Sequence, residues 1–114
     1  MAFIGWAEAL DTVNDDKEFL REVLDDLVTE LGTAKEEIAA AIKKKDFETI
    51  MKSAHRVKGS ASYLACHPLK DCAYTLQQMG HNGSTDADLE EIKAEFQRFN
   101  KLVVATEAEM KNMP

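Results

Sequence analysis

The chain has 114 residues, of which 45% are hydrophobic and 31% are charged, and its formal net charge is −7 at pH 7. This length fits one globular domain and is too short for a kinase or hydrolase that also carries a regulatory part. The negative charge argues against a nucleic-acid surface and favours a protein partner with a basic rim. No apolar run approaches the roughly 20 residues that a membrane helix needs.

The N-terminal sequence and the cysteine content indicate the compartment of the protein. The N-terminal residues lack the basic and uninterrupted apolar regions of a signal peptide, so we expect none. The two cysteines, Cys66 and Cys72, are too few for a disulfide framework and suit a reducing compartment. We therefore expect a cytoplasmic protein, small enough at 12.7 kDa to diffuse also into a nucleus if the organism is a eukaryote.

Helical periodicity begins with a short apolar segment over residues 3–10. Asn14 or Asp15 then offers an N-cap for a long helix. The hydrophobic residues of that helix recur every three or four positions from Leu20 to Ile42, and Gly32 can kink or split it. The spacing predicts a helix of about 29 residues, roughly 43 Å long at 1.5 Å per residue. Lys43, Lys44 and Lys45 follow. We interpret this positive cluster as the C-terminus of the helix, where positive charge is stabilising, rather than as a binding patch.

Three further helices follow in the same way. Asp46 is a natural N-cap for a helix whose hydrophobic positions run from Phe47 to Leu64 in steps of three and four. Pro68 ends this helix and can begin the next one. The segment 80–84, Gly-His-Asn-Gly-Ser, predicts a turn. Thr85 with Asp88 three residues later resembles a capping box for the final helix.

Four amphipathic helices with three short connections predict an all-α protein, an antiparallel up-down-up-down four-helix bundle with a short N-terminal capping helix. We assign residues 1–114 to a single domain, with a capping segment at 1–13 and the bundle at 15–112. Phe3, Ile4 and Trp6 should cover one end of the bundle.

His55 lies away from the hydrophobic stripe of its helix on a helical wheel. Gly59 is the anomaly beside it, because glycine in a helix interior costs about 1 kcal/mol relative to alanine. Close approach of a partner surface would explain that glycine, although the small residues 59–62 can also serve tight helix packing. A neutral imidazole is a nucleophile near pH 7, and Lys58 can offset the charge of incoming phosphoryl oxygens. The same surface contains Met51, Lys52, Lys58, Gly59 and Ser62.

These residues resemble a known family. His55-Arg56-Val57-Lys58-Gly59-Ser60 is similar to the His-x-x-Lys-Gly-Ser signature of histidine-containing phosphotransfer (HPt) domains. The segment from Asp16 to Leu24 resembles the Asp-x-x-Phe-Leu entry of that family, and the pair Asp46-Phe47 also fits. Downstream matches are Leu69, Cys72 and Gly80, so the resemblance covers about residues 15–83. One departure is Ala65, where members often have glycine.

The resemblance implies that His55 accepts a phosphoryl group from a receiver-domain aspartate or a sensor kinase and passes it to the aspartate of a response regulator. Lys58 would assist, and Met51, Lys52, Gly59 and Ser62 would contact the partner. In this family a hydrophobic patch beside the histidine receives the receiver domain, so the resemblance makes Phe3 or Trp6 an equal candidate for bordering that patch and for covering the core. Gln77, or Gln78 beside it, would steady the histidine ring. The receiver would bring the Mg²⁺, so the chain itself needs no cofactor. It would be a phosphorelay intermediate without independent turnover, usually a monomer, with no nucleic-acid or membrane partner.

Three alternatives stay open. The chain can be a helical adaptor in which His55 carries nothing, or the phosphotransfer segment of a larger hybrid kinase. Cys66, His67, Cys72 and His81 also invite a zinc hypothesis. Their spacings match no standard zinc module, Cys66-His67-Pro68 is a helix breaker, and Cys72 falls on the hydrophobic stripe. We therefore expect no metal site.

Overall fold

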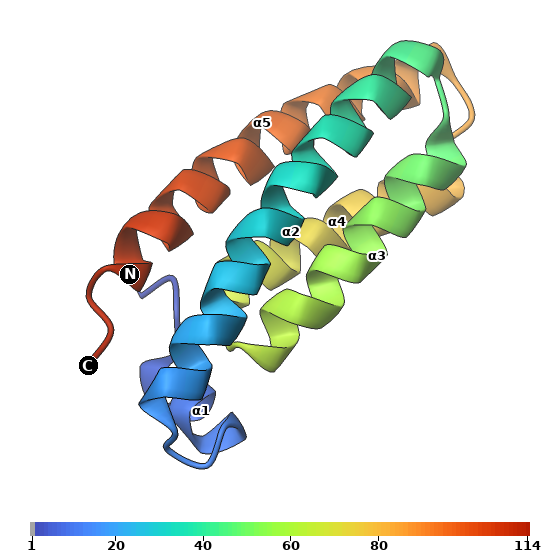
Figure 1. The fold of residues 1–114 in the computed structure, drawn as a ribbon. Coiled ribbons are helices and arrows are strands. Elements are labelled where there is room, and N and C mark those ends of the chain that lie inside the picture. The colour runs from blue at the N-terminus through green and yellow to red at the C-terminus, as the bar shows by residue number, and fades with distance from the viewer. Residues whose placement is uncertain (1) are drawn as a thin grey trace.

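The computed structural model describes residues 2–114, and over this range every regular element is a helix. In chain order the elements are α1 (Trp6–Thr12), α2 (Lys17–Lys44), α3 (Phe47–Tyr63), α4 (His67–Asn82) and α5 (Asp86–Met110). Figure 1 shows α2 to α5 side by side in an elongated bundle, with α1 at one end. The principal extents are 45 × 23 × 19 Å. The predicted all-α bundle with a short N-terminal helix is confirmed, and the short connections are consistent with the predicted up-down order.

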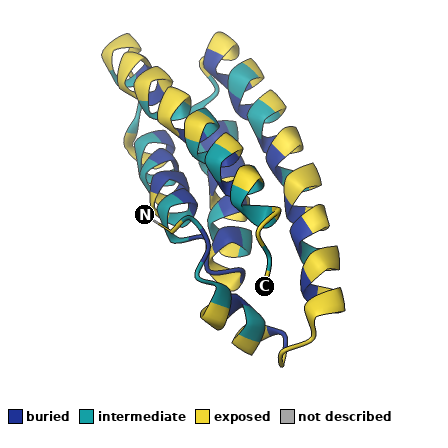
Figure 2. Ribbon diagram, turned by 90° about the vertical axis from the view of Figure 1, so that its left-hand side faces the viewer, coloured by how far each residue is buried: buried dark blue, intermediate teal, exposed yellow. Residues whose placement is uncertain are grey.

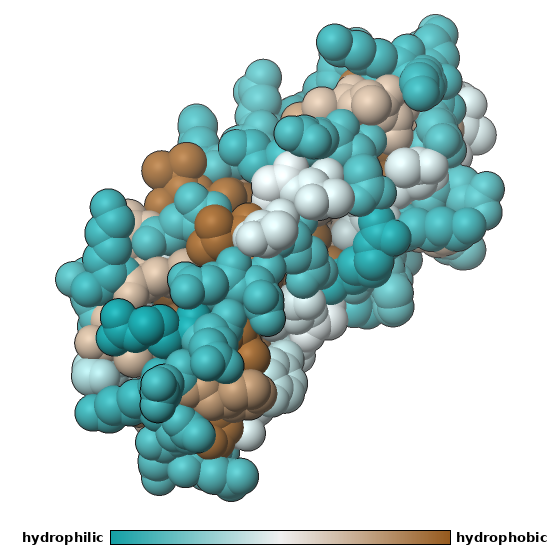
Figure 3. Space-filling model, in the orientation of Figure 1, coloured by the Kyte–Doolittle hydropathy of each residue, from teal (hydrophilic) through white to brown (hydrophobic). Residues whose placement is uncertain are grey.

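The core lies along the axis of the bundle, where each long helix contributes one buried stripe (Figure 2). Ile50 of α3, Leu76 of α4 and Phe99 of α5 are completely buried. Burial of such stripes supplies most of the stability of a helical bundle, because isolated helices of this length are marginal in water. In the described range, 2–114, no helix combines the length and the apolar character needed to cross a membrane. The outer face seen in Figure 3 is mainly hydrophilic, with separate hydrophobic areas.

The start of α2 differs from the prediction. The N-cap is Asp16, whose side chain accepts a hydrogen bond from the Phe19 N–H at 3.0 Å, so the prediction of Asn14 or Asp15 is wrong. An N-cap residue needs a negative φ, whereas Asn14 and Asp15 have φ values of 55° and 61° and form the turn after α1. The helix then runs unbroken for 28 residues, so Gly32 does not split it.

The other predicted helix ends are confirmed, with one exception. Asp46 caps α3, Pro68 lies in the first turn of α4, and Thr85 and Asp88 form a reciprocal capping box on α5. The predicted turn over residues 80–84 is wrong at its start, because α4 continues to Asn82.

Gly80 is therefore not a turn residue but a buried residue of α4. A Cβ atom at Gly80 would lie 2.8 Å from the backbone nitrogen of Met51 and 3.0 Å from the carbonyl oxygen of Phe47. Glycine is required there because the backbones of α3 and α4 approach each other closely. The helix that carries His55, α3, thus packs closely against α4.

Two hydrogen bonds fix how α3 is turned against α2. The Ser53 hydroxyl, which is buried, donates to a carboxylate oxygen of Glu37 at 3.0 Å, and the Ser60 hydroxyl donates to Glu30 at 2.7 Å. The two serines are seven residues apart on α3, and the two glutamates are seven residues apart on α2. The later serine pairs with the earlier glutamate, as expected for antiparallel helices. This arrangement turns the opposite side of α3, where His55 lies, toward solvent.

The N-terminal segment closes the end of the bundle near the connection between α3 and α4. Ile4 is buried, and the N–H of Gly5 donates to the Ala65 carbonyl at 2.8 Å. The carboxylate of Glu109 accepts from the N–H groups of Phe3 and Ile4 at 3.0 and 2.7 Å. Trp6 packs half-buried against the core. The predicted covering role is confirmed for Ile4 and Trp6. Ala65, which accepts the Gly5 hydrogen bond, follows the end of α3.

Candidate functional site

His55 is an exposed side chain near the middle of α3. Its Nδ1 atom lies 3.3 Å from Oε1 of Gln77 on α4. When Nδ1 carries the proton, it donates to this oxygen, and Nε2 then keeps its lone pair. Among residues 2–114, no side-chain hydrogen bond uses Nε2 of His55. The ring is therefore held at one nitrogen and open to solvent at the other, which is the arrangement that a nucleophile needs.

The imidazole borders an open hollow of about 330 Å³ between α3 and α4. Its lining consists of Met51, Lys52, His55, Arg56 and Gln77. The predicted residues Met51, Lys52 and Gln77 are thus brought together around the ring. Arg56 also lines the hollow, although the sequence analysis assigned it no role. A hollow beside an exposed nucleophile can admit the edge of a partner's active site.

The charges on α3 are mainly positive, in contrast to the rest of the bundle. The helix contains Lys52, Arg56 and Lys58 and one carboxylate, Glu48. By comparison, α5 contains three Lys or Arg residues and seven Asp or Glu residues. An acidic chain therefore presents its histidine on a helix that is locally basic. Such a field attracts anions and acidic partner sites to this face.

Two of the three cations on α3 are already paired with carboxylates. Nζ of Lys52 lies 3.0 Å from Glu48 one turn earlier, with both side chains largely exposed. Arg56 donates to Glu37 of α2 at 2.7 Å and to the Ser53 hydroxyl at 3.3 Å. The guanidinium of Arg56 is thus held toward Glu37 of α2.

Lys58 makes a different contact. Its Nζ lies 5.4 Å from the centre of the Tyr74 ring on α4, within the range of a cation–π interaction. The Tyr74 hydroxyl in turn accepts a hydrogen bond from Nε2 of Gln78 at 2.7 Å. Tyr74 was not recognised from the sequence. The signal that could have found it is its position three residues before Gln77, on the same face of α4.

Gly59 lies one turn after His55 and is exposed. A Cβ atom placed on it would have nothing within 4 Å, so packing inside the bundle does not require glycine there. A second hollow, between α2 and α3, has Gly59, Ser60 and Tyr63 in its lining. The surface around Gly59 is therefore open, as docking of a partner would require.

Ser62 is exposed seven residues after His55, about 10 Å along the helix. It lines neither hollow. The structure thus brings Met51, Lys52 and Gln77 to the ring and leaves Ser62 at the margin.

The cysteines and the other two histidines are dispersed. Burial raises the pKa of both thiols, Cys66 and Cys72, to about 12. The Cys72 thiol donates to Glu95 at 3.0 Å, and Nε2 of His67 lies 3.1 Å from both carboxylate oxygens of Glu8. Over residues 2–114, no three His, Cys, Asp or Glu side chains gather in a group that could hold a metal ion.

The fold and the site together define a class of protein: a helical bundle that presents one accessible, oriented histidine on a basic surface. The family model of the Hpt domain matches residues 22–108, well over half of the chain. The chain therefore belongs to the Hpt domain family, and the resemblance seen in the His55 motif is confirmed. Hpt domains are intermediates of histidine phosphotransfer in phosphorelays and work with receiver domains. The comparison with curated proteins gave no match.

Proposed function

We propose that this protein is a phosphorelay intermediate that carries the phosphoryl group on Nε2 of His55. It would take the group from the phosphoaspartate of a receiver domain, or from a sensor kinase, and pass it to the aspartate of a response regulator. The observation that carries the proposal is the geometry of His55, an exposed ring with Nδ1 facing Gln77 and Nε2 open. His67, by contrast, faces the carboxylate of Glu8 through its Nε2 atom.

The chemical step follows from this geometry. Nε2 attacks the phosphorus of the aspartyl phosphate, a nitrogen–phosphorus bond forms, and the phosphorus–oxygen bond to the aspartate breaks. The aspartate leaves as a carboxylate, and the imidazole becomes positively charged while Nδ1 keeps its proton. Gln77 Oε1 accepts a hydrogen bond from that proton and so stabilises the cationic ring. Lys58 offsets charge on the phosphoryl oxygens.

The remaining roles concern the partner. Gly59, Met51 and Lys52 would contact the receiver, with Ser62 at the edge of the contact. The receiver would contribute Mg²⁺ and its acidic residues, so this chain would need no cofactor and would have no turnover of its own. The basic character of α3 supports this division, because it complements an acidic receiver site. We further propose that the protein acts in the cytoplasm as a monomer.

The experiment is phosphoryl transfer from a phosphorylated receiver domain to the wild-type protein, to His55→Gln and to His81→Gln. His81→Gln is the matched control, since His81 is also exposed but lies at the end of α4. We expect transfer to the wild type and to His81→Gln, and none to His55→Gln. Equal transfer to all three would refute the role of His55.

The second candidate is a helical adaptor that binds partners without transfer. It would bind a receiver equally well with His55→Gln and would accept no label. A binding titration run beside the transfer assay distinguishes the two functions.

A further inference from the structure

The helices α3 and α4 meet at two side-chain contacts in the same antiparallel register. His55 contacts Gln77, and Lys58, three residues later on α3, contacts Tyr74, three residues earlier on α4. Residues three apart on a helix lie on one face. A single face of α4 therefore meets both residues of the phosphotransfer motif, and Gly80 permits the close approach of the two helices.

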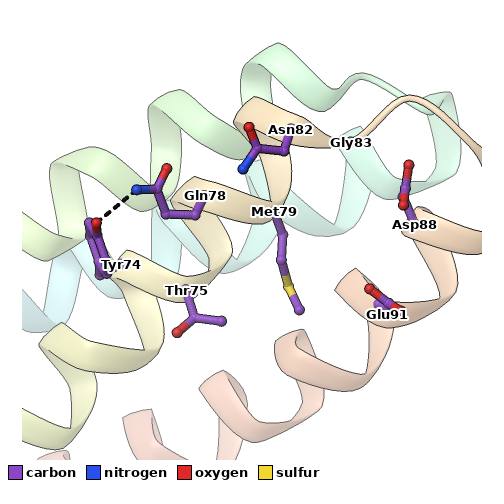
Figure 4. Close-up of a pocket in the computed structure, with 8 residues that line it drawn as sticks. All are labelled: Tyr74, Thr75, Gln78, Met79, Asn82, Gly83, Asp88 and Glu91. Atoms are coloured by element: carbon purple, nitrogen blue, oxygen red, sulfur yellow. Dashed lines mark hydrogen bonds between the residues drawn. The ribbon is translucent and has the colours of Figure 1, made fainter.

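Tyr74 is itself restrained, although its side chain is 48% exposed. Its hydroxyl accepts the hydrogen bond from Gln78 one turn later on α4, as Figure 4 shows. The ring is thus an anchored surface rather than a freely rotating one. A lysine side chain is long and flexible, so contact with an anchored ring limits the positions that its ammonium group occupies.

The cation–π contact of Lys58 affects its charge differently from the ion pairs of Lys52 and Arg56. Lys52 and Arg56 face carboxylates, which reduce the positive charge that they present. Among the ion pairs of residues 2–114, none involves Lys58. An aromatic ring attracts the ammonium group through its quadrupole and carries no net charge. Tyr74 can therefore hold Lys58 in place and leave its full charge available to an incoming phosphoryl group.

We propose that Tyr74 is a positioning residue that holds the Lys58 ammonium group beside His55 for phosphoryl transfer. The inference rests on the proposed phosphotransfer function and adds Tyr74 to the residues that support it. Tyr74 acts through its ring on Lys58 and does not touch the phosphoryl group. The ring should therefore matter for transfer only while Lys58 is present.

The test compares single-turnover transfer from one phosphorylated receiver to five proteins. These are the wild type, Tyr74→Phe, Tyr74→Leu, Lys58→Gln and the double variant Tyr74→Leu/Lys58→Gln. An exposed cation–π contact corresponds to a rate effect of about two- to fivefold, so we expect Tyr74→Leu to be slower by about that factor. Tyr74→Phe keeps the ring but loses the hydrogen bond from Gln78, so its rate should lie between those of the wild type and Tyr74→Leu.

The double variant separates positioning from a purely structural effect. We expect Tyr74→Leu to have no further effect in the Lys58→Gln background. An equal loss in both backgrounds would show that Tyr74 acts independently of Lys58 and would overturn the proposal. Thermal unfolding of each variant checks that the bundle is intact.

A spectroscopic measurement tests the contact without any transfer. The ring current of Tyr74 should move the proton signals of the Lys58 side chain upfield, and this shift should vanish in Tyr74→Leu and persist in Tyr74→Phe. A wild type that accepts no phosphoryl group would refute the proposed function and this inference with it. A wild type that transfers normally, with Tyr74→Leu at the same rate or with no ring-current shift, would overturn the inference alone.

Discussion

Gly59 and Gly32 offer a matched pair for testing whether the open surface beside His55 receives a partner. Both glycines lie inside helices, both are exposed, and a Cβ atom at either would have nothing within 4 Å. Replacing either glycine by glutamine should therefore stabilise its helix by about 0.5–1 kcal/mol. In a domain of this size that corresponds to a rise in Tm of about 2–5 °C.

The two substitutions should differ only in transfer. At Gly59 the glutamine side chain would project from the surface one turn from His55, where a docking receiver must approach. We expect Gly59→Gln to slow transfer at least about tenfold, equivalent to roughly 1.4 kcal/mol of lost interaction. Gly32→Gln, on α2, should transfer like the wild type.

The assays are thermal unfolding and single-turnover transfer from one phosphorylated receiver, run on both variants. A raised Tm together with slow transfer, for Gly59→Gln only, would support docking at this surface. Unchanged transfer in Gly59→Gln would refute the reasoning, because the added side chain would then meet no partner. Equal slowing in Gly32→Gln would also refute it, since the effect would not depend on proximity to His55.

Three further predictions concern the fold. Gly80→Ala should lower the free energy of unfolding in urea by about 1–2 kcal/mol, because its Cβ would meet the backbone of Met51; a stabilised variant would contradict the close packing. Lys45 has φ of 58°, so Lys45→Gly should raise that free energy by about 0.5 kcal/mol, and a loss would contradict the strain at that residue. Hydrogen bonds lower the pKa of the Asp46 and Asp88 carboxyl groups below the usual 3.8 in the folded protein. The ionised carboxylates therefore stabilise the fold fully above that pH. This stabilisation is lost as the pH falls through the folded pKa values. The double variant Asp46→Asn/Asp88→Asn should therefore show a smaller loss of stability between about pH 4 and pH 2 in urea titrations, and an unchanged loss would contradict this account.

Local sequence signals were sufficient for most helix ends. Asp46 precedes its helix directly, and the Thr85–Asp88 spacing encodes a capping box within four residues. The start of α2 was harder, because Asn14, Asp15 and Asp16 are all good capping residues. The choice of Asp16 depends on the turn that connects α1 to α2, in which the first two residues adopt positive φ.

The long-range features could not be predicted from spacing alone. The wheel showed that His55 faces outward, but the contacts of Tyr74 and Gly80 depend on the register between α3 and α4. That register results from the packing of whole helix faces. Ala65 illustrates the same limit: it departs from the family pattern and has φ of 57°, a conformation that favours glycine. Its methyl group is buried, and this burial offsets part of the strain.

The most direct measurement for the central claim is the location of the phosphoryl group on the protein. The phosphorylated protein would be fragmented under alkaline conditions, which preserve phosphohistidine, and the modified residue would be identified by mass spectrometry. We predict an acid-labile, alkali-stable modification on His55, with His67 and His81 unmodified. A phosphoryl group on either of those histidines, or on a carboxylate, would contradict it.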